Sequence, residues 1–251
     1  MEIDVKGLGF TSDDIAVVTG AGSGIGRSTA LMLARAGVAI AAWDLNEETV
    51  ESTAAEIQDL GIECLTTVAD LADPTAVSGA WSGTASFGRP VTYLVNNAGP
   101  AATTPLSVSD GVRIAIGSYS MVADAFVATS GDSAKAMTFT ASIAGNFFVG
   151  STQDWYPAAK AGMVGLMRHL AVKLRGQPRV NAVAPGPIRT QRMAASMESP
   201  ELRERMARRP IGRLGEPDEV AAAICFLLSP AAGYINGVTI PLDGGSTWTH
   251  S

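Results

Sequence analysis

Cysteine and histidine are scarce in this chain of 251 residues, which has two of each. Cys64 and Cys225 lie far apart in apolar stretches, and neither these residues nor His169 and His250 have companions at metal-ligand spacing. The sequence therefore predicts no metal site. Two isolated cysteines are typical of a reducing compartment, so we expect a cytoplasmic protein.

An excess of basic charge and a long apolar run are also lacking. The formal net charge is -6, which argues against nucleic acid as a partner because phosphate neutralisation needs a basic face. The longest apolar run, residues 220–228, is far shorter than the roughly 20 residues of a membrane span. Met1 begins a segment with acids rather than a basic and apolar leader. We expect a soluble, unprocessed protein without a membrane partner.

Hydrophobic residues, by contrast, are abundant, at 47% against 17% charged residues. Such a composition supplies a buried core of strands covered by helices. No linker, internal repeat or low-complexity segment interrupts the chain. We therefore expect residues 1–251 to form a single domain.

Short apolar runs alternate with helical patterns. Residues 15–19 are followed by a glycine cluster, and residues 25–36 carry apolar residues at helical spacing before Gly37. Asn46 and the pair Asp73-Pro74 are typical starts of the next two helices. Further strands are expected at 38–43, 63–69, 91–96, 137–142, 180–184 and 238–242, and further helices near 107–130, 156–175 and 217–228.

This alternation predicts an α/β fold, a doubly wound parallel sheet in a single Rossmann-type domain with right-handed crossovers. Ligands of such sheets bind beyond the carboxyl ends of the strands. The residues that follow each strand are therefore the candidates for function.

A glycine cluster follows the first strand, in the stretch Thr19-Gly20-Ala21-Gly22-Ser23-Gly24-Ile25-Gly26. Glycines there permit a tight turn and let backbone N–H groups approach a pyrophosphate at the positive end of the following helix. The position between a strand and a helix predicts a dinucleotide site, although glycines also serve close packing.

Asp44 ends the second strand and favours NAD over NADP. Its carboxylate can accept hydrogen bonds from the adenosine ribose hydroxyls and would repel a 2′-phosphate. Neither the segment 21–23 nor 45–46 supplies the Arg or Lys that a 2′-phosphate requires. Arg27 is expected to pair structurally. The alternative for Asp44 is a helix N-terminal acid.

Tyr156 and Lys160 are four residues apart, a spacing that places both side chains on one face of a helix. A phenol with a reference pKa near 10 is a poor base at neutral pH, but a positive charge nearby favours its ionised form. The pair is a candidate for acid-base catalysis. A solvated helix face is the alternative.

Together these residues resemble the short-chain dehydrogenase/reductase family over nearly the whole chain. Gly20, Gly24 and Gly26 correspond to the family's glycine motif, and Tyr156 with Lys160 to its active-site pair. The other matching segments, in family order, are Asp70-Leu71, Asn96-Asn97-Ala98-Gly99, Ser142 within residues 140–145, Pro185-Gly186-Pro187-Ile188-Arg189-Thr190 and Leu242-Asp243-Gly244-Gly245.

The resemblance implies a role for each matching residue. Tyr156 would be the general acid-base, Ser142 would hydrogen-bond the substrate oxygen, and Lys160 would bind the nicotinamide ribose and lower the pKa of the tyrosine. Ser142 has a structural alternative, a hydroxyl that satisfies a strand-end backbone group. The expected cofactor-binding residues are Gly20, Ser23, Gly24, Ile25, Gly26, Asp44, Asp70, Leu71, Asn97, Ala98, Gly99, Tyr156, Lys160, Pro185, Gly186, Ile188 and Thr190.

One family residue is missing. The family commonly has an asparagine on the helix after the fourth strand, where it helps hold a water that relays protons through the lysine. No asparagine occurs between Asn97 and Asn146, and Gly117 or Ser118 occupies the position. A backbone carbonyl or the Ser118 hydroxyl can hold such a water, so an altered relay is expected.

Aromatic and aliphatic residues between the serine and the tyrosine predict a pocket for an apolar or cyclic secondary alcohol or ketone. Core packing explains some of them equally well. The expected substrate-binding residues are Ser142, Asn146, Phe148, Gln153, Trp155 and Tyr156.

We expect a substrate lid at about residues 190–213. Its methionines suit an adaptable cover. Its arginines can receive a carboxylate or an acyl group borne by a carrier, although a solvated lid face is the simpler interpretation.

The sequence thus predicts an NAD-dependent alcohol dehydrogenase or carbonyl reductase. A 3-oxoacyl reductase is an alternative, supported by the lid arginines and weakened by Asp44. An NAD-sensing or scaffold protein without turnover is another, motivated by the missing asparagine and opposed by the retained Ser142, Tyr156 and Lys160. The resemblance also suggests a homotetramer or dimer packed through the helices near 107–130 and 156–175.

Overall fold

The computed structural model describes residues 3, 5–147, 153–193 and 199–248, and the strands of this part form one seven-stranded parallel sheet. The strand order is β3-β2-β1-β4-β5-β6-β7, so the direction of winding reverses between β1 and β4. This reversal confirms the doubly wound fold. The strands are β1 (Ile15–Thr19), β2 (Ala39–Asp44), β3 (Cys64–Val68), β4 (Tyr93–Asn96), β5 (Ala136–Thr140), β6 (Arg179–Pro185) and β7 (Thr239–Leu242).

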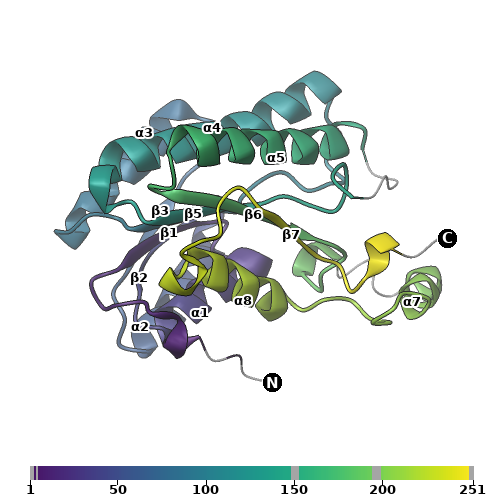
Figure 1. Cartoon of the computed structure of the whole chain (residues 1–251), viewed down its shortest axis with the longest axis horizontal. Helices are drawn as coiled ribbons and strands as arrows, with labels where there is room; N and C mark the ends of the chain where they lie inside the picture. The colour runs from purple at the N-terminus through teal and green to yellow at the C-terminus, as the bar shows by residue number, and fades with distance from the viewer. Residues whose placement is uncertain (1–2, 4, 148–152, 194–198, 249–251) are drawn as a thin grey trace.

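Helices cover both faces of the sheet (Figure 1). Helices α3, α4 and α5 lie on one face, and α1, α2 and α8 lie on the other. The described helices are α1 (Gly24–Arg35), α2 (Glu47–Asp59), α3 (Pro74–Gly83), α4 (Val108–Ser130), α5 (Trp155–Lys173), α7 (Pro200–Ala207) and α8 (Pro217–Leu228). Helix α7 was not expected as a separate element, because its many charged residues hide the apolar pattern.

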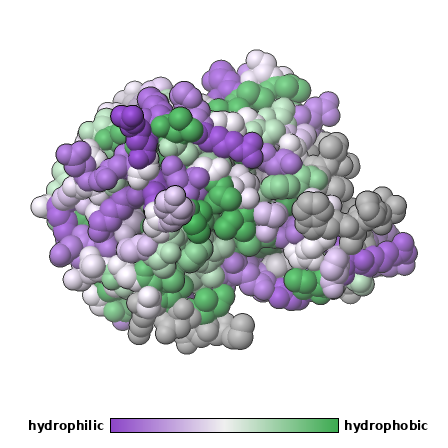
Figure 2. All heavy atoms as spheres, in the orientation of Figure 1, coloured by the Kyte–Doolittle hydropathy of each residue, from purple (hydrophilic) through white to green (hydrophobic). Residues whose placement is uncertain are grey.

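Each face of the sheet has its own hydrophobic core. Ile15 and Val17 of β1 pack in the core under α4 and α5, whereas Ala16 and Val18 pack in the core under α1 and α8. Successive strand residues point to opposite faces, so a strand covered on both sides must be apolar throughout. On the outside, hydrophilic and hydrophobic residues are interspersed, with one hydrophobic group near the middle of the face in Figure 2.

Local signals placed most helix starts correctly. The Asn46 side chain accepts a hydrogen bond from the Thr49 amide at 3.0 Å, and that of Asp73 accepts from the Thr75 amide at 2.8 Å. The fourth strand begins later than expected, at Tyr93.

Helix α4 and the turn after it, residues 108–133, are long and apolar enough by length and composition to cross a membrane. The helix was not recognised as a long apolar segment in the sequence, because polar residues interrupt it. Its Tyr119, Val122 and Phe126 are buried against the sheet. Length and composition alone are weak evidence for a membrane span, since the core helix of a globular domain passes the same test.

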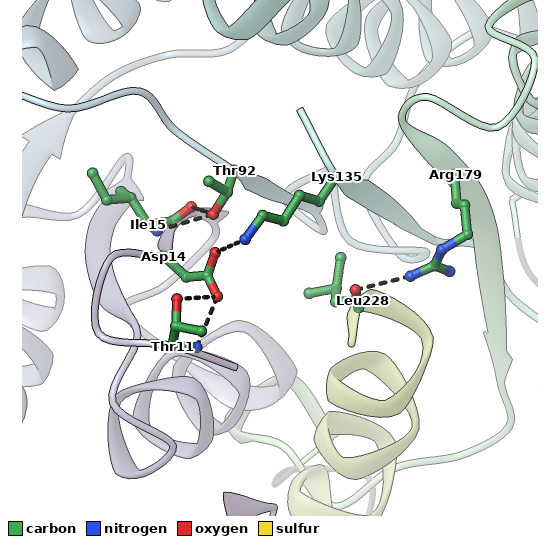
Figure 3. Close-up of polar contacts among 7 residues, drawn as sticks. All are labelled: Thr11, Asp14, Ile15, Thr92, Lys135, Arg179 and Leu228. Carbon is green, nitrogen blue, oxygen red and sulfur yellow. Dashed lines mark hydrogen bonds and ion pairs between the residues drawn. The ribbon is translucent and has the colours of Figure 1, made fainter. Parts of the chain in front are cut away.

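Charged side chains anchor the amino ends of the strands (Figure 3). The buried carboxylate of Asp14 accepts a hydrogen bond from Lys135 Nζ at 2.5 Å. The Arg179 guanidinium is also buried, and it donates to the carbonyl oxygens of Leu227, Leu228 and Ser229 at 2.8, 3.0 and 2.9 Å. The carbonyl end of a helix carries partial negative charge, so α8 partly neutralises this arginine.

Candidate active site

The glycine loop lies between β1 and α1, at the carboxyl edge of the sheet. Gly20 and Gly24 have φ angles of +69° and +53°, in the left-handed region that favours glycine. A Cβ on Gly26 would clash with the carbonyl group of Gly20. The chain therefore needs glycine at these positions to bring the start of α1 against the loop, an arrangement that suits a pyrophosphate.

Asp44 lies beside this loop, as the sequence predicts. Its Oδ2 accepts from the Gly22 amide at 2.9 Å, and its Oδ1 accepts from the Asn46 amide at 3.0 Å. Each carboxylate oxygen has a second acceptor site, so the side chain can still bind ribose hydroxyls. Arg27 pairs with Glu56 of α2 at 2.5 Å, which confirms its structural role.

The motif after β4 is joined to the end of β1. The Asn97 and Ala98 amides donate to Thr19 Oγ1 at 2.8 and 3.0 Å, and Asn97 Nδ2 donates to the Thr19 carbonyl at 3.1 Å. A Cβ on Gly20 would lie 2.9 Å from Asn97 Nδ2. Two motifs far apart in the sequence thus form one floor where the winding of the sheet reverses.

The remaining candidate cofactor residues lie along the same edge. A Cβ on Gly24 would lie 3.1 Å from Thr190 Cγ2, so the segment after β6 reaches the glycine loop. Asp70 is exposed after β3 and accepts from the Ala72 amide at 2.9 Å. Leu71 packs against the core under α4 and α5. These positions fit an extended dinucleotide that crosses the carboxyl ends of the strands.

Ser142 follows β5 and is buried. Its Oγ accepts a hydrogen bond from the Ala144 amide at 3.1 Å, so the structural role of the hydroxyl is real. This bond uses a lone pair and not the hydroxyl proton. Ser142 can therefore hold its turn and donate to a substrate oxygen at the same time.

Tyr156 and Lys160 lie in the first turns of α5, on one face of the helix, as their spacing predicts. Lys160 Nζ is 5.7 Å from the centroid of the Tyr156 ring and donates to the Thr140 carbonyl at 2.7 Å. Tyr156 is half-buried and Lys160 is buried. An ammonium withdrawn from water beside a phenol is the arrangement needed for a tyrosine base.

Tyr119 of α4 is a site residue that sequence reasoning missed. Its ring centroid is 5.6 Å from Lys160 Nζ, and its hydroxyl donates to the Thr140 carbonyl at 3.2 Å. The hydroxyl of Ser118, a predicted occupant of the asparagine position, instead donates to the Ile114 carbonyl of its own helix at 2.7 Å. A buried stripe at helical spacing that contains a tyrosine is the signal that could have pointed to Tyr119, since a buried phenol needs a partner.

Two predicted substrate residues have structural partners. Asn146 Nδ2 donates to the Ser142 carbonyl at 2.9 Å and to the Lys160 carbonyl at 3.1 Å, which braces the loop against α5. Trp155 is 1% exposed and its indole donates to the Thr104 carbonyl at 2.9 Å. The structure therefore places Trp155 in the core, the second of the two interpretations above.

Gln153 and Phe148 are the other two predicted pocket residues. Gln153 is exposed just before α5. Phe148 lies outside the described residues.

The expected lid contains α7 and lies at the same end of the molecule as the C-terminus (Figure 1). Met193 packs with Met206 and Leu214 in a small separate cluster. The described pairs of arginine and glutamate here are Arg189 with Glu216 at 2.8 Å, Arg208 with Glu204 at 2.9 Å and Arg213 with Glu219 at 2.7 Å. Because these arginines have carboxylate partners, the solvated-face interpretation is favoured over an acyl-group receiver.

A cavity of about 650 Å³ lies elsewhere, between α3 and α4. Trp81, Val91, Met121 and Ala125 are among its lining residues. None of the predicted site residues that the structure describes lines it. The candidate site therefore rests on the motifs at the carboxyl edge and not on this cavity.

Comparison with known proteins gives matches along almost the whole chain. The family model described as Enoyl-(Acyl carrier protein) reductase matches residues 20–247. Levodione reductase of Leifsonia aquatica is 34% identical, with 94% of this chain and 95% of that protein covered. Cyclohexanol dehydrogenase of Acinetobacter sp. (strain SE19) is 35% identical, with 94% and 96% covered.

A solved structure agrees with the fold and with a nicotinamide cofactor. It is a 7α-hydroxysteroid dehydrogenase complexed with NADH and 7-oxo glycochenodeoxycholic acid, with a TM-score of 0.85 and 29% identity over 94% of this chain and 98% of that chain. The extent of these matches and the motifs found in order along the sequence show that the chain belongs to the short-chain dehydrogenase/reductase family.

Proposed function

We propose that this protein is an NAD-dependent alcohol dehydrogenase or carbonyl reductase that transfers a hydride between nicotinamide and an apolar or cyclic secondary alcohol or ketone. One observation carries the proposal. Tyr156 and Lys160 lie on one face of α5, with 5.7 Å between Lys160 Nζ and the tyrosine ring, at the edge that holds the glycine loop.

The residues of the chain supply position and a proton path. When bound, the dinucleotide supplies the hydride acceptor or donor. In oxidation the Tyr156 phenolate removes the alcohol proton, and Ser142 donates a hydrogen bond to the substrate oxygen. Lys160 favours the phenolate through its charge and binds the ribose. Proton transfer of this kind contributes about 10² to 10⁴ in rate.

Asp44 supports NAD as the preferred cofactor. The Gly22 and Asn46 amides hold its carboxylate at the ribose end of the site, and a 2′-phosphate there would meet a negative charge. The basic side chain of Arg27 is engaged by Glu56.

Names of relatives support the substrate class. Cyclohexanol dehydrogenase, at 35% identity, is named for a cyclic secondary alcohol, and levodione reductase and 7α-hydroxysteroid dehydrogenase are among the other matches. We extend this class to the present chain because these relatives match it over 94% of its length.

The test is a substrate screen that follows NADH absorbance. Cyclohexanol and larger cyclic alcohols are compared with acyclic alcohols, each with NAD and with NADP, and a 3-oxoacyl thioester is tested with NADH and NADPH. We expect the highest kcat/KM with NAD and cyclic alcohols. Clear NADPH preference on the thioester favours the 3-oxoacyl reductase, and cofactor binding without any turnover favours the sensor.

We also propose a cytoplasmic homo-oligomer, a dimer or tetramer, that packs through α4 and α5. Burial raises the pKa of the Cys64 thiol to about 12, and Cys225 is also buried and free, which suits a reducing compartment. Light scattering on the purified protein tests the assembly, and a monomeric mass would refute it.

A further inference from the structure

The Lys160 side chain contacts a residue of α4 as well as one of its own helix, α5. The Thr140 carbonyl at the end of β5 accepts from Lys160 Nζ at 2.7 Å and from the Tyr119 hydroxyl at 3.2 Å. The same ammonium is 5.6 Å from the Tyr119 ring centroid and 5.7 Å from that of Tyr156. Two aromatic rings and one carbonyl thus surround one positive charge.

We propose that Tyr119 is a positioning residue of the active site, whose ring and hydroxyl hold the Lys160 ammonium at the Thr140 carbonyl and so replace the support that the missing asparagine would give from α4. The proposal rests on the proposed function, because it concerns the residue that activates Tyr156.

Burial of the ammonium makes this support necessary. Lys160 is 8% exposed, and an ammonium removed from water is costly unless nearby groups compensate. Both ring centroids lie within the roughly 6 Å at which a cation is attracted to an aromatic face, and the attraction is stronger where water is excluded. The carbonyl supplies the direct hydrogen bond, and the rings stabilise the charge.

Tyr119 is itself held rigidly. It is fully buried, and its ring meets the Phe139 ring edge to face with centroids 5.2 Å apart. Its carbonyl accepts from Asn96 Nδ2 at 2.9 Å, so the residue is joined to the end of β4 as well as to β5. A ring fixed to two central strands presents a constant surface to Lys160.

Removal of the Tyr119 ring should therefore weaken the support that the Lys160 ammonium gives to the Tyr156 phenolate. Without the ring, the Lys160 ammonium is held less firmly beside Tyr156, so the phenolate is less favoured and alcohol oxidation requires a higher pH. We expect Tyr119→Leu to move the acid limb of the kcat/KM profile upward by about half a pH unit or more. Tyr119→Phe keeps the ring and loses only the hydroxyl, so its profile should move less than half as far.

Phe126→Leu is the matched control. Phe126 is a fully buried aromatic residue of the same helix, two turns further along, in the same core. It should lose thermal stability to a similar extent without any shift of the acid limb. A Tyr119→Leu profile that coincides with the wild type, or an equal shift in Phe126→Leu, would overturn the proposal.

A second measurement needs no turnover. The chain has four lysines, Lys6, Lys135, Lys160 and Lys173, so NMR can follow the titration of each side chain in the cofactor-free protein, with Lys160→Arg to assign the signal. We expect the Lys160 midpoint to fall in Tyr119→Leu and to remain near the wild-type value in Phe126→Leu. An unchanged midpoint refutes the role of Tyr119. If the wild type oxidises no alcohol, the proposed function fails, while this titration still decides the role of Tyr119.

Discussion

Replacement of Asp44 by alanine should weaken NAD binding and relax the discrimination against NADP. The side chain accepts two backbone hydrogen bonds, from Gly22 at 2.9 Å and from Asn46 at 3.0 Å, and in the proposed complex it also accepts from the ribose. Hydrogen bonds to a charged group contribute about 1.5 to 3 kcal/mol each. The two backbone bonds are also made without cofactor, so only the ribose contacts enter the binding free energy. Because Asp44 is half-buried and water can partly replace those contacts, we expect a loss of about 2 to 4 kcal/mol of NAD binding free energy.

That loss corresponds to NAD affinity about 30 to 1,000 times weaker. NADP should lose less, because the substitution also removes the repulsion between the carboxylate and the 2′-phosphate. At an effective dielectric constant near 20, two like unit charges about 4 Å apart repel by about 4 kcal/mol. The ratio of the two affinities should therefore change by at least about tenfold, or 1.4 kcal/mol.

Isothermal titration with NAD and NADP measures both dissociation constants. Asp44→Asn keeps an acceptor of similar size without the charge, so it separates repulsion from hydrogen bonding. Glu47→Ala removes the same charge from an exposed position at the start of α2 and should leave the ratio unchanged. If Asp44→Ala weakens NAD and NADP equally, Asp44 only holds the loop and the argument for NAD fails.

Tyr156→Phe should lower kcat by about 10² or more with little change in NAD affinity, and near-normal turnover would remove the phenol from proton transfer. Gly26→Ala should destabilise the protein by about 1 to 3 kcal/mol and weaken NAD, because the added methyl group meets the Gly20 carbonyl; unchanged thermal unfolding and affinity would show that the loop tolerates a side chain. Arg179→Met should lower the free energy of unfolding by about 2 to 4 kcal/mol, because carbonyl groups at the end of α8 lose their donor. Urea unfolding measures this loss, and a change below about 1 kcal/mol contradicts it.

Features that depend only on residues close together in the sequence could be predicted. The predicted strand 15–19 has the same bounds as β1. A strand buried on both faces is nearly continuous in apolar residues, so its ends are easy to locate in the sequence. Asn46 caps α2 and the Tyr156 and Lys160 side chains share a face, since both depend only on spacing along a helix.

Features that depend on distant residues could not be predicted. Just before the fourth strand, the Thr92 hydroxyl exchanges two 3.0 Å hydrogen bonds with the backbone of Ile15, 77 residues away, and no local pattern predicts such a contact. Tyr119 reaches Lys160 only because α4 and α5 pack together, and Trp155 turns to the core because Gly111 of α4 leaves room for its ring. The sequence shows that these helices carry apolar residues, but the tertiary packing determines which side chains contact one another.

The buried charges at the amino ends of the strands have a consequence for protein engineering. Asp14, Lys135 and Arg179 fasten the sheet at the end opposite to the glycine loop and the tyrosine. The contacts that stabilise the fold here and the residues proposed for catalysis thus lie at opposite ends of the strands. Substitutions at the amino ends can therefore be selected for thermal stability, and substitutions at the carboxyl ends can be selected separately for substrate specificity.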